Sequence, residues 1–203
     1  RLATSPIMIA MPTERPGEPF VLDMATSVVA EGKLRVATNK GVPVPEQWIV
    51  DGDGNPTTDP RDFYGTGGNS TPGALLTVGG ATSGYKGFGL SMAVEALSGV
   101  LSGAGTAEAG PRGTNGVFLM ALDPDAFAGL DAFMAMLTGF ADYVRQPPYQ
   151  PGVEEVLVAG EPERRAMAHR LEHGLELDDE TWKQIVDAGV SYGVSAIDLT
   201  PSV

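Results

Sequence analysis

Glycine and proline interrupt this chain so often that most of it can form only short helices and strands. Its 203 residues include 27 Gly and 16 Pro, which are spread along the sequence and do not gather in one low-complexity tract. Both residues mark turns, because glycine reaches backbone angles that others avoid and proline ends regular hydrogen bonding. Hydrophobic residues make up 42% of the chain, which is enough for a buried core. The sequence therefore predicts a folded protein built from short elements.

Acidic residues outnumber basic ones two to one, with 26 Asp and Glu against 13 Lys and Arg. The formal net charge of −13 repels nucleic-acid phosphates and anionic lipid surfaces. No apolar run approaches the roughly 18 residues that a membrane-spanning helix needs. We therefore expect neither nucleic acid nor a membrane as a partner. A phosphate-bearing ligand would need a local site made of helix N-termini and a placed cation.

Cysteine is absent, which excludes disulfides, thiolate zinc sites and a cysteine nucleophile. The two histidines, His169 and His173, lie four apart without an acidic metal motif, so we interpret them as surface residues and expect no metal. No secretory signal opens the chain, and a cytoplasmic location is expected. The chain begins at Arg1 without a Met, which indicates the middle of a longer polypeptide.

Apolar spacing predicts the elements of a mixed α/β layout in one unit, without a regular βαβ series. Gly41 is placed to end the first helix, Asp123 is placed to cap a later one, and Asp178 or Asp179 caps the last. Residues 43–80 are rich in proline and glycine and are expected to be irregular. The predicted strands cover 7–11, 20–22, 75–78, 117–122 and 153–158, and the predicted helices 24–39, 87–103, 123–145, 161–173 and 178–192.

Three strand-to-helix junctions have polar or glycine character and could line one crevice. In residues 83–89, glycines lead into a helix whose N-terminus offers free N–H groups, and Lys86 adds a charge, which suggests an anion site. Asp23 can cap the helix after it, beside the hydroxyls of Thr26 and Ser27. Gly160 and Pro162 mark the third helix start. The alternative for each junction is an ordinary helix start with a surface lysine or a cap.

Two other motif classes are weak or missing. No Gly-x-Gly-x-x-Gly follows a predicted strand, so the sequence gives no Rossmann fingerprint. Asp51 to Asp62 begins like a calcium loop but has Pro56 where the turn needs glycine and Asp where the loop closes with Glu. An Asp/Asn turn explains the same residues. A calcium- or sugar-binding surface domain remains a third hypothesis for this stretch.

Six segments that span nearly the whole chain carry recognisable motifs. They are Ala3-Thr4-Ser5-Pro6-Ile7, Phe20-Val21-Leu22-Asp23-Met24-Ala25-Thr26-Ser27, Gly52-Asp53-Gly54-Asn55-Pro56-Thr57-Thr58-Asp59-Pro60, Gly84-Tyr85-Lys86-Gly87-Phe88-Gly89-Leu90, Phe118-Leu119-Met120-Ala121-Leu122-Asp123-Pro124 and Gly160-Glu161. In this order, they resemble motifs of the malate/L-lactate dehydrogenase family of non-Rossmann NAD(P)-dependent oxidoreductases. This family also contains sulfolactate, ureidoglycolate and diketogulonate dehydrogenases and a cyclic imino acid reductase.

The resemblance implies a mixed α/β, non-Rossmann dinucleotide-binding fold with a largely antiparallel sheet and flanking helices. It implies a dinucleotide-binding domain over 1–145, incomplete at its N-terminal side, and a part over 146–203 that completes the cofactor site and packs on the missing N-terminal segment. The implied cofactor is NAD or NADP, and Tyr85 stands where many relatives have His. The implied cofactor-binding residues are Leu22, Asp23, Met24, Ala25, Thr26, Ser27, Val28, Tyr85, Lys86, Gly87, Gly160, Glu161 and Pro162.

The resemblance also implies hydride transfer between NAD(P)H and a small 2-oxo or 2-hydroxy acid of the malate or lactate type. The family's catalytic His and nearby Arg lie in an N-terminal segment that this sequence does not match, so no catalytic residue is assigned here. A homodimer, or a complex with a chain carrying that segment, is expected. The alternatives are an NADPH-dependent reductase of a cyclic imino acid and a non-catalytic nucleotide-binding fragment.

Overall fold

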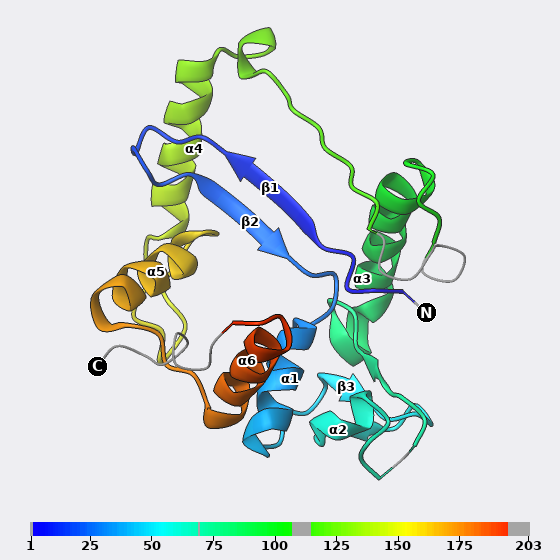
Figure 1. The fold of residues 1–203 in the computed structure, drawn as a ribbon. Coiled ribbons are helices and arrows are strands. Elements are labelled where there is room, and N and C mark those ends of the chain that lie inside the picture. Colours follow the sequence, from blue (N-terminus) through cyan, green and yellow to red (C-terminus); the bar gives the residue numbers. More distant parts are fainter. Residues whose placement is uncertain (1, 69, 107–114, 195–203) are drawn as a thin grey trace. The chain divides into compact units, whose positions relative to one another are not determined.

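A computed structural model describes residues 2–68, 70–106 and 115–194 (Figure 1). The chain divides into two compact units, which are described separately. Unit 1 comprises Arg1–Thr26 and Gly89–Gly174, and unit 2 comprises Ser27–Phe88 and Leu175–Val203. Both combine helices with small antiparallel pairings, which confirms the mixed α/β prediction. Across the described ranges, no helix combines the length and apolarity needed to cross a bilayer.

A two-stranded antiparallel hairpin forms the start of unit 1. β1 (Ile7–Met11) pairs with β2 (Phe20–Met24), with Ile7 opposite Met24 and Met11 opposite Phe20. The predicted hairpin is confirmed, and its second strand is longer than the predicted 20–22. The loop between the strands lies against a helix, where the Glu14 N–H donates to Thr138 Oγ1 at 3.0 Å.

Of the two helices predicted for residues 123–173 of unit 1, the second has its predicted start and the first is divided. Asp123 caps a short 3₁₀ turn (Pro124–Ala126) by accepting from the Asp125 N–H, and Gly129, at φ +90°, then leads into α4 (Leu130–Val144). The single helix predicted over 123–145 is therefore two elements. α5 (Glu161–His173) has its predicted bounds, with Gly160 before it in a left-handed conformation.

Two predicted strands of unit 1 are absent from the structure. Residues 117–122 and 153–158 carry the apolar character of strands, but neither segment has a strand partner among the described residues. Figure 1 shows the first as a long irregular connection that leads to α4. An apolar run becomes a strand only when another strand satisfies its backbone, so these predictions are wrong for the chain as it stands.

Unit 2 begins with a helix that starts later than predicted. α1 (Glu31–Lys40) follows Ala30 and ends at Gly41, which takes the left-handed conformation expected of a helix-ending glycine. The predicted helix began at Met24. Residues 24–28 are not helical, because Met24 belongs to β2 and the Val28 N–H donates to the Leu76 carbonyl at 2.8 Å.

The proline- and glycine-rich stretch 43–80 is more regular than expected. It contains β3 (Ile49–Val50), β4 (Pro56–Thr57), α2 (Pro60–Phe63) and β5 (Ala74–Leu75), and the strands form an antiparallel sheet in the order β4-β3-β5. β5 replaces the predicted strand at 75–78. Ile49 in the central strand is fully buried, so this stretch builds the core of its own unit.

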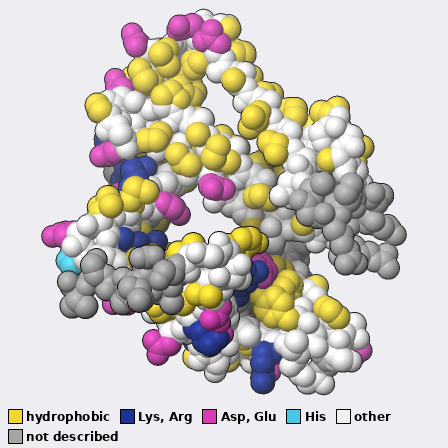
Figure 2. Space-filling model, viewed as in Figure 1, with side chains coloured by type: hydrophobic (Ala, Val, Ile, Leu, Met, Phe, Trp, Pro, Cys, Tyr) yellow, Lys and Arg dark blue, Asp and Glu magenta, His cyan; other side chains and the backbone are white. Residues whose placement is uncertain are grey.

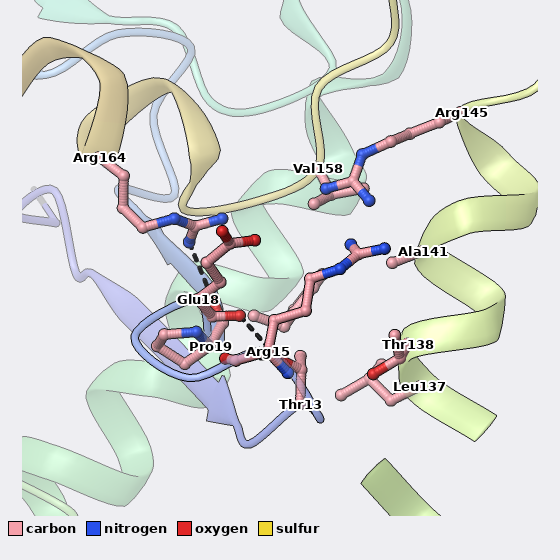
Figure 3. Close-up of a pocket in the computed structure, with 11 residues that line it drawn as sticks. Thr13, Arg15, Glu18, Pro19, Leu137, Thr138, Ala141, Arg145, Val158 and Arg164 are labelled. Carbon is pink, nitrogen blue, oxygen red and sulfur yellow. Dashed lines mark hydrogen bonds between the residues drawn. The ribbon is translucent and has the colours of Figure 1, made fainter. Parts of the chain in front are cut away.

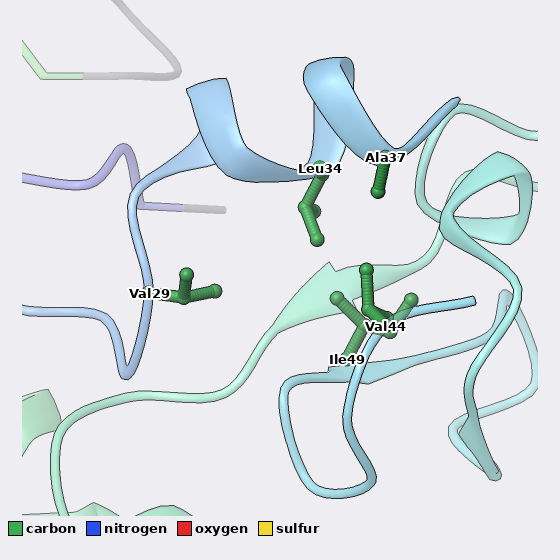
Figure 4. Packing of buried hydrophobic residues seen from close by; sticks show 5 residues of the cluster. All are labelled: Val29, Leu34, Ala37, Val44 and Ile49. Carbon is green, nitrogen blue, oxygen red and sulfur yellow. The ribbon is translucent and has the colours of Figure 1, made fainter. Parts of the chain in front are cut away.

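A compact hydrophobic cluster holds unit 2 together (Figure 4). Leu34 on α1 and Ile49 on β3 are both 0% exposed. The remaining buried members are Val29, Ala37 and Val44. α6 (Asp179–Ser191) also belongs to this unit, and of the two predicted caps Asp178 is the one that caps it, accepting from the Thr181 N–H at 2.9 Å. Asn39 on α1 donates to Thr181 Oγ1, which ties the two helices together.

The boundary between the units falls inside α3 (Gly80–Glu95). This helix is kinked at Ser83, whose φ of −134° and ψ of 19° are not helical, and a π-helical turn (Ala96–Val100) follows it. The predicted helix over 87–103 therefore starts seven residues earlier, and its last part is not α-helical. Lys86 is the third residue after the kink.

Candidate functional site

The first predicted cofactor segment, residues 22–28, begins inside the β-hairpin of unit 1. Leu22 and Asp23 pair with Ile9 and Met8 across the hairpin, so Asp23 is a strand residue and not the helix cap that the sequence suggested. Thr26 is 1% exposed, and both its N–H and its Oγ1 donate to the Thr4 carbonyl at 2.9 Å. This hydroxyl proton is already used within the protein.

The segment ends in unit 2, where hydrogen bonds to residues 76–77 and a bridge hold it in a non-helical conformation. Ser27 forms an antiparallel bridge with Thr77, and its Oγ donates to the Val29 carbonyl at 2.7 Å. The expected hydroxyls of Thr26 and Ser27 at a helix start are therefore not found there, because α1 begins only at Glu31. The sequence pattern predicted the start of this helix too early, because the hydrogen bonds and the bridge between residues 27–28 and 76–77 join segments that are distant in sequence.

The second predicted segment, residues 85–87, lies on α3 just after its kink. Tyr85 is 72% exposed, and the Lys86 ammonium lies 5.9 Å from the centre of its ring, an attractive cation–π geometry. Within the part of the chain that the structure describes, Lys86 forms no ion pair with a carboxylate. Its charge is therefore available to an anion, in a protein whose net charge is −13.

The glycine of this segment serves packing and not ligand approach. A Cβ on Gly87 would lie 2.4 Å from the Val78 carbonyl oxygen and 2.5 Å from its nitrogen. The Gly87 N–H donates to that carbonyl at 3.1 Å, and Thr77 Oγ1 donates to the Gly84 carbonyl at 2.6 Å. The expectation that these glycines leave room for a ligand is wrong at Gly87, because residues 77–78 fill the space.

The third predicted segment, residues 160–162, adjoins the hairpin within unit 1. The Val21 N–H donates to the Ala159 carbonyl at 3.2 Å. Gly160 has φ +90°, a backbone angle that favours glycine, and a Cβ there would lie tightly against Val21 at 3.2 Å. Pro162 occupies the first turn of α5, as predicted. Unit 1 therefore places the third segment directly against β2, beside the start of the first.

Glu161 is engaged with arginines. Its carboxylate accepts from Arg145 at 3.0 Å, from Arg165 at 2.9 Å and from the Val158 N–H at 3.3 Å. The hydrogen bond from Arg145 is the largest cause that lowers the pKa of this carboxyl. The side chain is 17% exposed. Glu161 therefore joins the end of α4 to the start of α5 through ion pairs with arginines from both sides.

Sequence reasoning missed a small cavity next to this network. It measures about 20 Å³, room for about one water molecule, and lies between the hairpin loop, α4 and α5. Figure 3 shows the guanidinium groups of Arg15, Arg145 and Arg164 around it. Arg15 pairs with Asp142 and lowers the pKa of that carboxyl, and Arg164 donates to the Pro19 carbonyl at 2.9 Å. The sequence feature that could have indicated this cavity is the presence of Arg15, Arg145 and Arg164 in a chain that is otherwise acidic.

The calcium hypothesis gains no support from the geometry. Asp51 Oδ1 accepts from the N–H groups of Asp53 and Asn55 at 3.0 and 2.8 Å, which is an ordinary Asx turn. Asp62 accepts from Thr57 Oγ1 at 2.7 Å. Among the residues with described positions, no three acidic or histidine side chains are arranged to hold a metal ion.

Comparison with known proteins identifies a consistent set of relatives. A family model described as malate/L-lactate dehydrogenase matches residues 1–186. The L-lactate dehydrogenase of Cupriavidus necator is 38% identical over 199 residues, which cover 96% of this chain and 54% of the relative. The chain therefore spans about half the length of the curated relatives it matches.

Solved structures agree with this result. The malate dehydrogenase of Pyrococcus horikoshii superposes with a TM-score of 0.75 at 31% identity, covering 96% of this chain and 52% of that one. The Δ1-piperideine-2-carboxylate reductase of Pseudomonas syringae superposes with a TM-score of 0.60 at 26% identity, covering 96% and 52%. These likenesses confirm the predicted fold class.

Proposed function

Because the chain belongs to the malate/L-lactate dehydrogenase family, we propose that it is the dinucleotide-binding part of an oxidoreductase that acts on small hydroxy acids. The proposed reaction moves a hydride between the nicotinamide C4 of NAD(P)H and the carbonyl carbon of a 2-oxo acid. The observation that carries this proposal is the family match over residues 1–186. The cofactor supplies the hydride chemistry, and the protein holds and orients it.

Lys86 and Tyr85 are the residues of this chain best fitted to hold the dinucleotide. The exposed ammonium suits a cofactor phosphate, and the exposed ring beside it suits an aromatic base. We propose cofactor contacts also at residues 22–28 and 160–162. Most hydrogen-bonding groups of these two segments already bond to other residues of the protein. The segments would therefore contact the cofactor mainly through their backbone and their surface shape, and would add little charge.

The proton of the reaction needs an acid/base group, and neither histidine of this chain lies near the proposed cofactor segments 22–28 and 85–87 in sequence. His169 and His173 stack on the exposed surface of α5 with ring centres 4.3 Å apart, and His173 Nδ1 lies 3.0 Å from the His169 carbonyl. We propose that the acid/base histidine belongs to the part of the family chain outside this sequence. The division into residues 1–145 and 146–203, and the choice between a homodimer and a complex with that part, stay predictions.

A second candidate reaction is the reduction of a cyclic imino acid. The structural likeness to the piperideine carboxylate reductase favours it. Reduction of a C=N bond uses the same hydride donor and the same need for a proton, so the dinucleotide-binding residues serve both reactions.

The proposal is tested with purified chain, with and without a polypeptide that carries the remaining part of the family sequence. Oxidation of NADH and NADPH is followed with oxaloacetate, pyruvate or Δ1-piperideine-2-carboxylate, and calorimetry measures cofactor binding. We expect binding by the chain and turnover only in the combined sample. Binding without turnover in both samples would identify a non-catalytic nucleotide-binding fragment. Absence of binding in both would refute the proposal.

A further inference from the structure

The start of α5 is bonded to the hairpin of unit 1 on both sides of Gly160. Before this glycine, the Ala159 carbonyl accepts from the Val21 N–H at 3.2 Å. After it, Arg164 donates to the Pro19 carbonyl at 2.9 Å, and Figure 3 shows the Arg164 side chain directed at that residue. The two bonds hold the junction that leads into α5 against the second strand of the hairpin and the residue before it.

A network of ion pairs joins the same junction to α4. Arg145, the residue at which α4 ends, donates from one guanidinium nitrogen to Glu161 at 3.0 Å and from the other to Asp142 at 3.2 Å. The Tyr149 hydroxyl donates to the Arg145 carbonyl at 2.7 Å. The Arg145 and Glu161 side chains are 24% and 17% exposed, so solvent and salt screen this pair less than a fully exposed one. Figure 2 shows basic side chains next to acidic ones over the end of α4 that adjoins α5.

A second arginine contacts Glu161 from within α5. Arg165 donates to the other carboxylate oxygen of Glu161 at 2.9 Å, and it also donates to Glu155. Its side chain is 51% exposed. Because Arg165 and Glu161 lie one turn apart on the same helix, their ion pair does not join that helix to α4. Arg165 therefore places the same charge beside Glu161 without the link that Arg145 makes.

The proposed cofactor contacts of residues 160–162 depend on where this junction is held. The Glu161 carboxylate already accepts from two arginines and from the Val158 N–H. What remains for a ligand is backbone and surface shape. Such contacts are strongest when the backbone is fixed before the ligand arrives, because ordering it during binding costs free energy. A residue that fixes the junction therefore affects affinity without touching the ligand.

We propose that Arg145 is a positioning residue for the dinucleotide, which acts through Glu161 to hold the start of α5 where residues 160–162 meet the cofactor. This inference rests on the proposed function, because it presupposes cofactor binding at this junction. Replacing Arg145 frees the junction from α4 and leaves its two bonds to the hairpin in place.

Calorimetric titration of the whole chain with NADH and NADPH tests the proposal, at a temperature well below the unfolding midpoint of each variant. We expect Arg145→Gln to raise the dissociation constant about tenfold, because the junction must then be ordered during binding. Arg145→Lys keeps the charge and is expected to bind more tightly than Arg145→Gln. Arg165→Gln is the matched control, since it also removes an arginine from Glu161, and it is expected to bind like wild type.

A double variant shows whether Arg145 acts through Glu161. We expect Arg145→Gln combined with Glu161→Gln to bind no more weakly than the weaker single variant, because both substitutions break the same link. Losses that multiply would overturn the proposal, and so would equal losses in the Arg145→Gln and Arg165→Gln variants. If Arg145→Gln does not fold, Glu161→Gln is measured in its place, and wild-type affinity there overturns the proposal.

The same measurements separate this inference from the proposed function. An Arg145→Gln variant that unfolds at a lower temperature but binds cofactor like wild type would identify an ion pair that only stabilises the fold. That result overturns the inference and leaves the proposed function intact. A wild-type chain that binds neither NADH nor NADPH refutes the proposed function, and this inference with it.

Discussion

Lys86 carries a full positive charge on an exposed helical surface of a protein with a net charge of −13. We expect Lys86→Ala to weaken dinucleotide binding by about 1.5–3 kcal/mol, the range for a hydrogen bond to a charged group. Calorimetric titration measures the dissociation constant. Lys33→Ala, an exposed lysine on α1, is the control and is expected to bind normally. An unchanged constant in the Lys86 variant would remove the anion-site proposal.

The absence of a Cβ at Gly87 allows α3 to pack closely against the backbone of Val78. We expect Gly87→Ala to lower the free energy of unfolding by about 1–3 kcal/mol, because its Cβ would overlap the Val78 backbone. Gly32→Ala on α1 is the matched control, since a Cβ there meets nothing within 4 Å and alanine favours a helix. Urea unfolding measures both variants. A Gly87 variant as stable as the control would mean that α3 can shift away from residue 78.

Glu161 makes stability depend on pH in a definite direction. Arg145 lowers the pKa of this carboxyl below its ordinary value. The ion-paired carboxylate therefore stabilises the fold fully above the unfolded pKa of about 4.3, and this stabilisation is lost as pH falls through the lower folded pKa. We expect Glu161→Gln to be less stable than wild type at neutral pH and the difference to shrink in acid. Glu163→Gln, an exposed neighbour, should track wild type at every pH.

At the scale of elements, helix ends were predictable and strand pairing was not. Asp123 and Asp178 mark their helix starts in the sequence because a cap side chain bonds to an N–H two or three residues away. Gly160 marks its helix start through its left-handed backbone conformation. The helix predicted from Met24 begins at Glu31 instead, because residues 26–28 bond to residues 4 and 76, and no local pattern contains those contacts.

In the candidate site, too, features that depend on one residue could be predicted from the sequence, and features that depend on distant residues could not. The sequence picked out Lys86 and Gly160, whose charge and backbone freedom are properties of single residues. It misread the purpose of Gly87 and the position of Asp23, because both depend on a neighbour distant in sequence. The arginine-lined cavity also escaped prediction, since its walls come from the hairpin loop, α4 and α5.

The cap of α6 gives an element-scale prediction. Asp178 accepts from both the Thr181 N–H and the Thr181 Oγ1, at 2.9 and 2.8 Å. We expect Asp178→Ala to lower the midpoint of thermal unfolding and to increase fraying of the first turn of α6. Asp23→Ala should cost clearly less, because Asp23 lies exposed in β2 and caps no helix. A larger effect at Asp23 would restore its sequence-based interpretation as a cap.

At the scale of the whole molecule, the uneven distribution of buried side chains predicts uneven stability. Unit 2 closes its own core around Leu34 and Ile49, and unit 1 buries little besides Ala141 in its described residues. We therefore expect hydrogen exchange of the chain alone to show slow amides in α1 and β3 and fast ones throughout the hairpin and α4. Leu34→Ala should destabilise the slow-exchanging part by about 2–5 kcal/mol, because it leaves a cavity in a closed core, without changing exchange in the hairpin. One cooperative unfolding transition that includes both units, with equal protection in each, would show instead that unit 1 is stable in the absence of a partner.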